Sequence, residues 1–178
     1  MRNLRVKRIA FTAVCIAFAA VFLALTGALP AARLAFLAAA GMFPFLDDLI
    51  LGRRYSIPAA FLGGLLGWLF GSGYASALAY LAFFGSYPIY RNFLAGKLPG
   101  KKALSYVLKF LWFNAACALL YFAARSLFPE IEIDIDATVL IVLLPPCLNA
   151  VLFLYDLLLT QAAGWVFKKF DRLFRSLF

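Results

Sequence analysis

The residues of this chain that could do chemistry are polar side chains set inside long apolar runs. Lys109 lies about five residues into the run 104–128, and Asp156 lies about five residues before the end of the run 138–161. If the two runs are antiparallel helices, both side chains lie roughly 8 Å inside the same membrane interface. Ionisable residues in a membrane span are functional candidates, so we expect the two to pair. The alternative is that Lys109 extends to the lipid headgroups while Asp156 faces the cytoplasmic loops.

Asn114 and Asn149 lie near the middle of the same two runs. Amide side chains at that depth form hydrogen bonds across a helix interface, worth about 0.6 to 2 kcal/mol each. Helix packing is the favoured interpretation, and contact with a ligand is the alternative. Lys109, Asn114, Asn149 and Asp156 are therefore the candidate substrate-binding residues.

Several kinds of chemistry are excluded by what the sequence lacks. It contains no histidine, which removes His-based zinc sites, haem ligation and Ser-His-Asp triads. Its three cysteines lie in apolar runs without CxxC spacing. Asp47 and Asp48 lack the surrounding motif of the CDP-alcohol transferases. We expect no catalytic residues, no metal, no cofactor and no enzymatic activity.

The composition places the chain in a membrane. Of its 178 residues, 66% are hydrophobic and 14% are charged, against about 45–50% and about 25% in soluble domains. The apolar excess has to face lipid, which predicts a multi-pass protein of the cell membrane. The net charge of +9 lies mostly in short loops, where it meets the anionic inner leaflet. We therefore expect the lipid bilayer, and not nucleic acid, to be the partner of this charge.

Six apolar runs approach the roughly 20 residues that a spanning helix needs. They are residues 9–29, 34–51, 56–70, 74–93, 104–128 and 138–161. The first is too long for a signal-peptide core, so we expect a retained span. Prolines lie inside the second, fourth and sixth runs and leave main-chain carbonyls without donors. Such breaks mark transporter sites or simple kinks, and a kink is the favoured interpretation for Pro88.

The basic residues alternate between the loops. Fourteen of the 17 Lys and Arg residues fall in the N-terminal segment, the second and fourth loops and the C-terminal tail, whereas Arg33 and Arg125 fall in the opposite loops. The positive-inside rule then puts both termini in the cytoplasm. Residues 165–178 predict a basic amphipathic helix in the inner interface. We expect an all-α, single-domain bundle (residues 1–178) of about six transmembrane helices.

Small residues recur at four-residue spacing in the first and third runs, as in Ala13 with Ala17 and Gly63 with Gly67. With its basic start, alanine-patterned first span and cytoplasmic ends, the whole chain resembles in layout the S components of energy-coupling factor transporters. The resemblance implies that Ala13 and Ala17 dock on a transmembrane coupling subunit. It also implies two partner ATPases and a vitamin or trace solute bound near the outer face. This chain departs from that pattern, because its polar intramembrane residues cluster in the cytoplasmic half and middle.

Two functions follow as hypotheses. The first is a solute-binding transport subunit, whose energy comes from partners or gradients because the sequence has no Walker motif. The alternative is a non-catalytic membrane scaffold or assembly protein that acts through its basic inner face and tail. In either case we expect a plain N-terminal half and a site on the last two spans.

Overall fold

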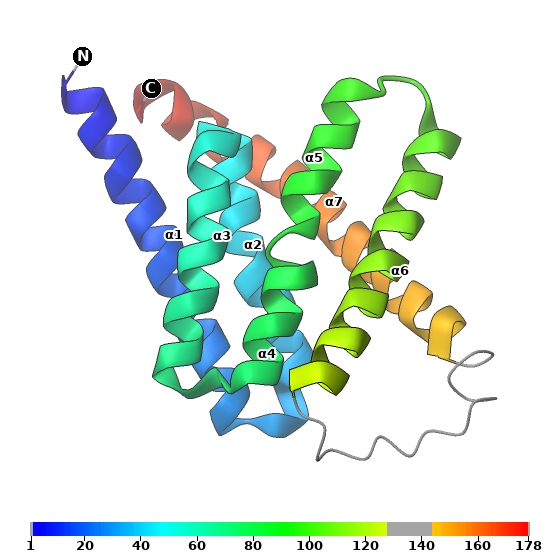
Figure 1. Ribbon diagram of the computed structural model, residues 1–178. Helices are drawn as coiled ribbons and strands as arrows, with labels where there is room; N and C mark the ends of the chain where they lie inside the picture. The colour runs from blue at the N-terminus through cyan, green and yellow to red at the C-terminus, as the bar shows by residue number, and fades with distance from the viewer. Residues whose placement is uncertain (1, 128–143, 178) are drawn as a thin grey trace.

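The computed structural model describes residues 2–127 and 144–177 and is helical, with no strand among these residues. The all-α prediction is confirmed. Figure 1 shows the α-helices as a bundle; they are α1 (Arg2–Ala28), α2 (Arg33–Leu51), α3 (Arg53–Gly67), α4 (Tyr74–Ala79), α5 (Tyr87–Lys97), α6 (Lys102–Leu127) and α7 (Leu144–Leu177). Three short segments join them, the 3₁₀ turn η1 (Pro30–Ala32) and the π-helical segments η2 (Trp68–Ser72) and η3 (Tyr80–Phe84).

Among the described residues, five helical stretches are long and apolar enough to cross a membrane. They are Leu4–Ala28, Pro30–Leu51, Arg53–Ser72, Lys102–Phe122 and Pro146–Val166. Large apolar side chains point outward from them, and Leu111 and Phe122 each leave 65% of their surface exposed. Exposed side chains of this kind need lipid around them, so the chain is a helical protein compatible with a membrane.

The fourth predicted span, 74–93, is not a single helix. It divides into α4, η3 and α5, with a turn at Gly85 and Ser86, and Figure 1 shows α4 and α5 one above the other. The Gly85 N–H donates to the Tyr80 carbonyl at 2.7 Å, five residues back, which is the π-helical bond. Pro88 lies in the first turn of α5, where proline is well tolerated, although its missing N–H leaves the Phe84 carbonyl without a helical donor. The predicted kink is therefore a helix break.

The sixth predicted span falls in α7, whose described part runs from Leu144 to Leu177 and includes Pro145 and Pro146. The predicted start of this span at residue 138 and the acidic loop 130–136 lie outside the described residues.

The tail is not set apart as a helix of its own, because α7 continues to Leu177. Gly164 is the one glycine between the predicted span and the tail, and a single glycine costs a helix only about 1 kcal/mol. At 34 residues, α7 is about 51 Å long. The hydrocarbon core is about 30 Å thick, so an end of α7 extends beyond it.

Helices α1 and α3 pack closely through glycines. A side chain on Gly27 would collide with the Gly71 carbonyl, and one on Gly67 would press on Leu23. The small residues of the third predicted span therefore do lie at a helix interface. Helix α6 differs, since Phe113 and Ala116 are its only buried residues among those described. In Figure 1 it stands on the side opposite α1.

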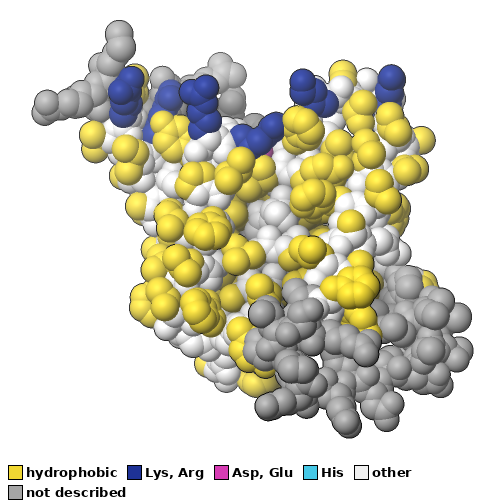
Figure 2. Space-filling model, in the orientation of Figure 1, with side chains coloured by type: hydrophobic (Ala, Val, Ile, Leu, Met, Phe, Trp, Pro, Cys, Tyr) yellow, Lys and Arg dark blue, Asp and Glu magenta, His cyan; other side chains and the backbone are white. Residues whose placement is uncertain are grey.

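The start of α1 and the end of α7 lie at the same end of the bundle, together with the α2–α3 and α5–α6 connections (Figure 1). Figure 2 shows Lys and Arg side chains gathered there. We call this the basic end; its exposed members are Arg5, Lys7, Arg53, Arg54, Lys97, Lys101 and Lys102. The bundle thus has one strongly cationic end, as the charge alternation along the chain predicts.

Candidate functional site

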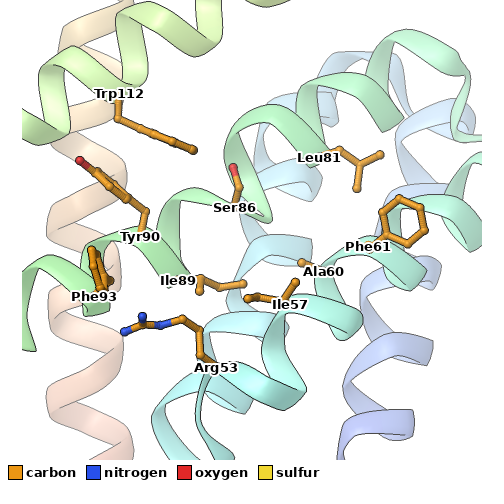
Figure 3. Close-up of a pocket in the computed structure, with 10 residues that line it drawn as sticks. All are labelled: Arg53, Ile57, Ala60, Phe61, Leu81, Ser86, Ile89, Tyr90, Phe93 and Trp112. Atoms are coloured by element: carbon orange, nitrogen blue, oxygen red, sulfur yellow. The ribbon is translucent and has the colours of Figure 1, made fainter.

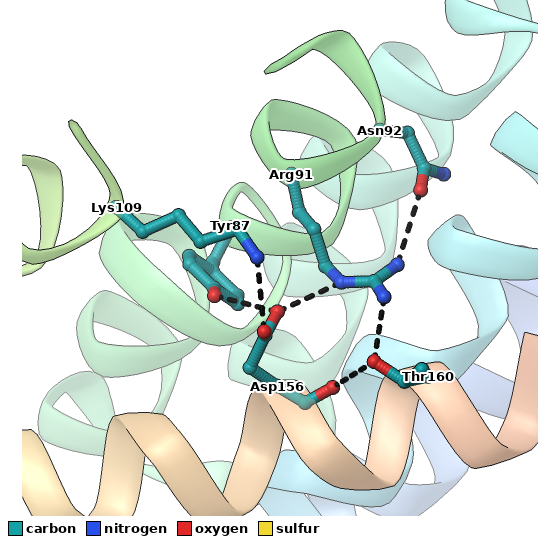
Figure 4. Close-up of polar contacts among 6 residues, drawn as sticks. All are labelled: Tyr87, Arg91, Asn92, Lys109, Asp156 and Thr160. Atoms are coloured by element: carbon teal, nitrogen blue, oxygen red, sulfur yellow. Dashed lines mark hydrogen bonds and ion pairs between the residues drawn. The ribbon is translucent and has the colours of Figure 1, made fainter. Parts of the chain in front are cut away.

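A single carboxylate on α7 joins three helices. Asp156 is 9% exposed. Its Oδ2 accepts a hydrogen bond from Lys109 Nζ at 2.9 Å, and its Oδ1 accepts from Arg91 Nε at 2.7 Å and from the Tyr87 hydroxyl at 2.9 Å (Figure 4). The expected contact between Lys109 and Asp156 is present, so Lys109 does not extend to the headgroups. Its role in binding a solute stays a prediction.

Helical spacing explains how the donors converge. Tyr87 and Arg91 are four residues apart on α5, and Asp156 and Thr160 are four apart on α7, so each pair shares one helix face. The Thr160 hydroxyl accepts from Arg91 Nη2 at 2.7 Å and donates to the Asp156 carbonyl at 2.7 Å. We call Tyr87, Arg91, Lys109, Asp156 and Thr160 the Asp156 node. It holds two cations against one carboxylate, a formal excess of one positive charge.

The hydrogen bonding continues from the node toward the N-terminal helices. Arg91 Nη1 lies 3.5 Å from Asn92 Oδ1, at the limit of a hydrogen bond. Asn92 Nδ2 donates to Asp48 Oδ2 at 2.8 Å, and the Ser56 hydroxyl donates to Asp48 Oδ1 at 3.0 Å. Polar contacts therefore connect α7, through α5, with α2 and α3.

Tyr155, the residue before Asp156, supplies the hydrogen-bond donor that is missing at the break between η3 and α5. Pro88 has no N–H to donate to the Phe84 carbonyl, and the Tyr155 hydroxyl donates to that carbonyl at 3.1 Å instead. Gly41 of α2 closes the other side, where any side chain would collide with the Phe84 carbonyl and the Tyr155 hydroxyl. A free carbonyl at membrane depth needs a partner of this kind. Two consecutive residues of α7 thus have separate roles. Tyr155 accounts for the Phe84 carbonyl at the helix break, and Asp156 binds the donors of the node.

The two predicted asparagines also meet. Asn114 Nδ2 donates to Asn149 Oδ1 at 3.3 Å and to the Phe110 carbonyl at 2.7 Å. Asn149 precedes Asp156 by seven residues of α7, which is roughly 10 Å along the helix. The four predicted site residues therefore form two separate cross-helix pairs and not one cluster. The favoured interpretation of the asparagines as packing contacts agrees with this geometry.

The expectation of a plain N-terminal half is wrong. Asp47 of α2 is fully buried, and the Thr12 hydroxyl of α1 lies 3.0 Å and 3.3 Å from its two carboxylate oxygens. A buried carboxylate needs a hydrogen-bond donor, and Thr12 supplies one from the neighbouring span. Asp48, next in the chain, is engaged by Ser56 and Asn92.

Sequence reasoning missed most of the Asp156 node. The charge alternation counts Arg91 among the basic residues of the fourth loop, on the cytoplasmic side, because it lies near the end of the predicted span. The four-residue spacing of Tyr87 and Arg91 was the available signal. On α1, Ala13 and Ala17 are exposed, so nothing in the described part of the chain covers them.

Within residues 2–127 and 144–177 there is no group of three or more acidic or cysteine side chains that could hold a metal ion. The chemistry of the site is that of ion pairs and hydrogen bonds between helices. Comparison of the chain with protein-family models, curated proteins and solved structures finds no match in any of the three.

Proposed function

We propose that this chain is a solute-binding subunit of a membrane transporter, without an ATPase of its own. The observation that carries the proposal is the Asp156 node, where three charged side chains meet beside a broken helix. A charged residue at the centre of a span costs about 2.5 to 3.5 kcal/mol on the insertion scale, and such residues mark solute paths. Broken helices are likewise common at transporter binding sites.

The charge of the node indicates the class of solute. Arg91 and Lys109 both bind Asp156, so one positive charge is left without a counter-charge within the node. An anionic group of a small solute would balance this charge. It could also replace the Asp156 carboxylate as the acceptor of Lys109, since both are oxygen anions with similar geometry. We therefore expect a carboxylate- or phosphate-bearing solute.

The packing of the bundle supports a movement that exposes the node. Helices α1 and α3 are held by close glycine contacts, and α2 meets η3 and α7 closely at Gly41. Helix α6, in contrast, buries little and is joined to α7 by the Lys109–Asp156 and Asn114–Asn149 contacts. A typical hydrogen bond has a net worth of only about 0.5 to 1.5 kcal/mol. We propose that α6 moves relative to α7 and the rest of the bundle when solute enters.

The coupling partner would bind α1. Ala13 and Ala17 are exposed on it, and small side chains let a second helix approach closely. This fits the resemblance to energy-coupling factor S components, in which a transmembrane coupling subunit and two ATPases supply the energy. The chain would then be a multi-pass protein of the cell membrane.

Co-purification tests the transport proposal. Tagged protein would be extracted from its own membranes in mild detergent, and mass spectrometry would identify both its partner proteins and its bound small molecules. We expect a partner with a Walker motif and an anionic solute. Lys109→Gln should lose the solute and keep the partner. Ala17→Trp should lose the partner and keep the solute. The control Lys102→Gln, at the exposed start of α6, should keep both.

A scaffold is the second candidate, and one observation favours it. Both oxygens of Asp156 are already occupied by donors from the protein itself, as in a purely structural ion pair. A wild-type protein that purifies alone and without solute would contradict the transport proposal and favour the scaffold.

We further propose six membrane crossings with both termini in the cytoplasm. The basic end and the positive-inside rule support this orientation. The test is cysteine labelling in a variant whose three native cysteines are replaced by alanine. With an impermeant maleimide on intact cells, Ala31→Cys should react at once and Lys101→Cys only after the membrane is opened. The opposite result would invert the topology.

A further inference from the structure

A groove lies on the side of the bundle between α3 and the fourth span (Figure 3). Its larger part has a volume of about 520 Å³ and is lined from α3, η3, α5, α6 and the turn at Ser86. A second part of about 240 Å³ shares Phe61 and Leu81 with the first and extends to Trp68. We call the two together the α3 groove. Along α3 it runs from Arg53 to Trp68, which is roughly 22 Å.

The walls of the α3 groove are apolar and outward-facing. Ile57, Phe61 and Trp112 are 55%, 58% and 38% exposed. The hydroxyl of Ser86 donates to the Ala82 carbonyl at 2.8 Å, so it is already satisfied within its own helix turn. A concave surface of this kind accepts a flexible hydrocarbon chain and has little to offer a polar solute.

One end of the groove is charged. Arg53, the first residue of α3, is exposed at the basic end and is the one charged side chain that lines the groove in the described part of the chain. Its guanidinium carbon lies 4.4 Å from the centre of the Phe93 ring, which holds the side chain over the groove. Among the described residues Arg53 forms no ion pair.

The nearby carboxylate forms no ion pair with Arg53 in the described part of the chain. Asp48 lies beside it in a neighbouring recess, but its two oxygens accept from the neutral donors Ser56 and Asn92. The guanidinium is a planar fork of donors that matches a phosphate group well. A cation at one end of an apolar groove is complementary to an anionic amphiphile.

We propose that the α3 groove binds a membrane phospholipid with an anionic headgroup. The headgroup phosphate lies at Arg53, and one acyl chain follows the groove past Phe61 and Leu81. One leaflet of the hydrocarbon core is about 15 Å thick, so a chain of ordinary length fits within the roughly 22 Å available. This site is distinct from the Asp156 node, and its occupant is part of the bilayer rather than a transported solute.

Tryptophan quenching by brominated lipids tests the proposal, because Trp112 lines the groove. A variant with Trp68→Phe and Trp165→Phe keeps Trp112 as its sole reporter. It would be reconstituted in vesicles that contain either brominated phosphatidylglycerol in unlabelled phosphatidylcholine or the reverse. We expect Trp112 to show about a fivefold preference for phosphatidylglycerol, which corresponds to about 1 kcal/mol for one basic residue.

Two further variants locate the preference. Arg53→Gln should reduce the preference at Trp112 to about one, whereas the neighbouring exposed Arg54→Gln should leave it unchanged. A second reporter, which retains only Trp165 on α7, should give the same quenching with and without Arg53→Gln. The proposal is overturned if wild-type Trp112 shows no preference. It is equally overturned if Arg53→Gln has no effect, or if Arg54→Gln has the same effect.

Discussion

Lys109 Nζ lies 2.9 Å from Asp156 Oδ2, which ties α6 to α7. Few apolar contacts join these two helices, since α6 buries only Phe113 and Ala116 among its described side chains. The ion pair therefore helps to hold α6 in place, a role that apolar packing fills for the other helices of the bundle. Arg91 shares the same carboxylate, so the three charges act as one unit.

Asp156→Asn should destabilise the protein more than Lys109→Gln. The first change leaves Arg91 and Lys109 buried without their counter-charge, which costs about 3 to 5 kcal/mol. The second leaves Asp156 with donors from Arg91 and Tyr87, so we expect about 1 to 2 kcal/mol. Unfolding midpoints in detergent micelles measure both. Equal losses would show that Lys109 alone sustains the node.

Exchanging the two charges should restore only part of the stability. With Lys109→Asp and Asp156→Lys combined, the new cation on α7 would face Arg91, which lies 2.7 Å from the present carboxylate. Like charges at that distance repel, so the double variant should be more stable than Asp156→Lys alone, which leaves three cations and no carboxylate, but less stable than the wild type. Unfolding midpoints in detergent micelles compare the double variant with each single variant. Full recovery would mean that Arg91 takes no part in the node.

Two buried tyrosines should respond in opposite directions to removal of the hydroxyl. The Tyr87 hydroxyl donates to Asp156, so Tyr87→Phe should cost about 1.5 to 3 kcal/mol. Among the described residues the Tyr80 hydroxyl has no hydrogen-bond partner, although Tyr80 is fully buried. Tyr80→Phe should therefore gain about 1 kcal/mol. Thermal melts of the two matched variants compare them, and a loss with Tyr80→Phe would reveal a partner for that hydroxyl.

Gly41→Ala should destabilise the break in the fourth span. The added methyl would collide with the Phe84 carbonyl and with the Tyr155 hydroxyl that serves it, at a cost of about 1 to 3 kcal/mol. Gly96→Ala is the control, since a methyl there meets open space. It should gain about 0.5 to 1 kcal/mol from the helix propensity of alanine. Denaturation of the two variants in the same detergent separates the effects, and equal responses would rule out the collision.

Much of the fold could be predicted, because a helix in lipid satisfies its own main chain. The length of an apolar run therefore reports the length of the helix directly, and the run 34–51 became α2 with a difference of one residue. The break at Gly85 and Ser86 could not be placed in this way. It depends on Tyr155 of a distant helix, which supplies the missing donor.

The candidate site was predicted in part for a similar reason. Equal depth on antiparallel helices was enough to bring Lys109 and Asp156 together. Depth along one helix says nothing about which faces of other helices meet, so the Thr12–Asp47 contact could not be foreseen. Depth alone places Arg91 with the cytoplasmic loop, and the sequence does not reveal the extra residue in η3 that sets the direction in which α5 presents it.

The extra residue in η3 sets how α5 is rotated about its own axis. Each residue of an α-helix turns the chain by about 100°, and the π-helical turn Tyr80–Phe84 holds one residue more than an α-turn. With this residue included, Tyr87 and Arg91 face α7 and bind Asp156. Deleting Ala82 would shorten the span very little, yet it would rotate α5 by about 100° and turn both side chains away from Asp156. In this protein the angular setting of one helix, more than its depth in the membrane, decides whether the charged site is assembled.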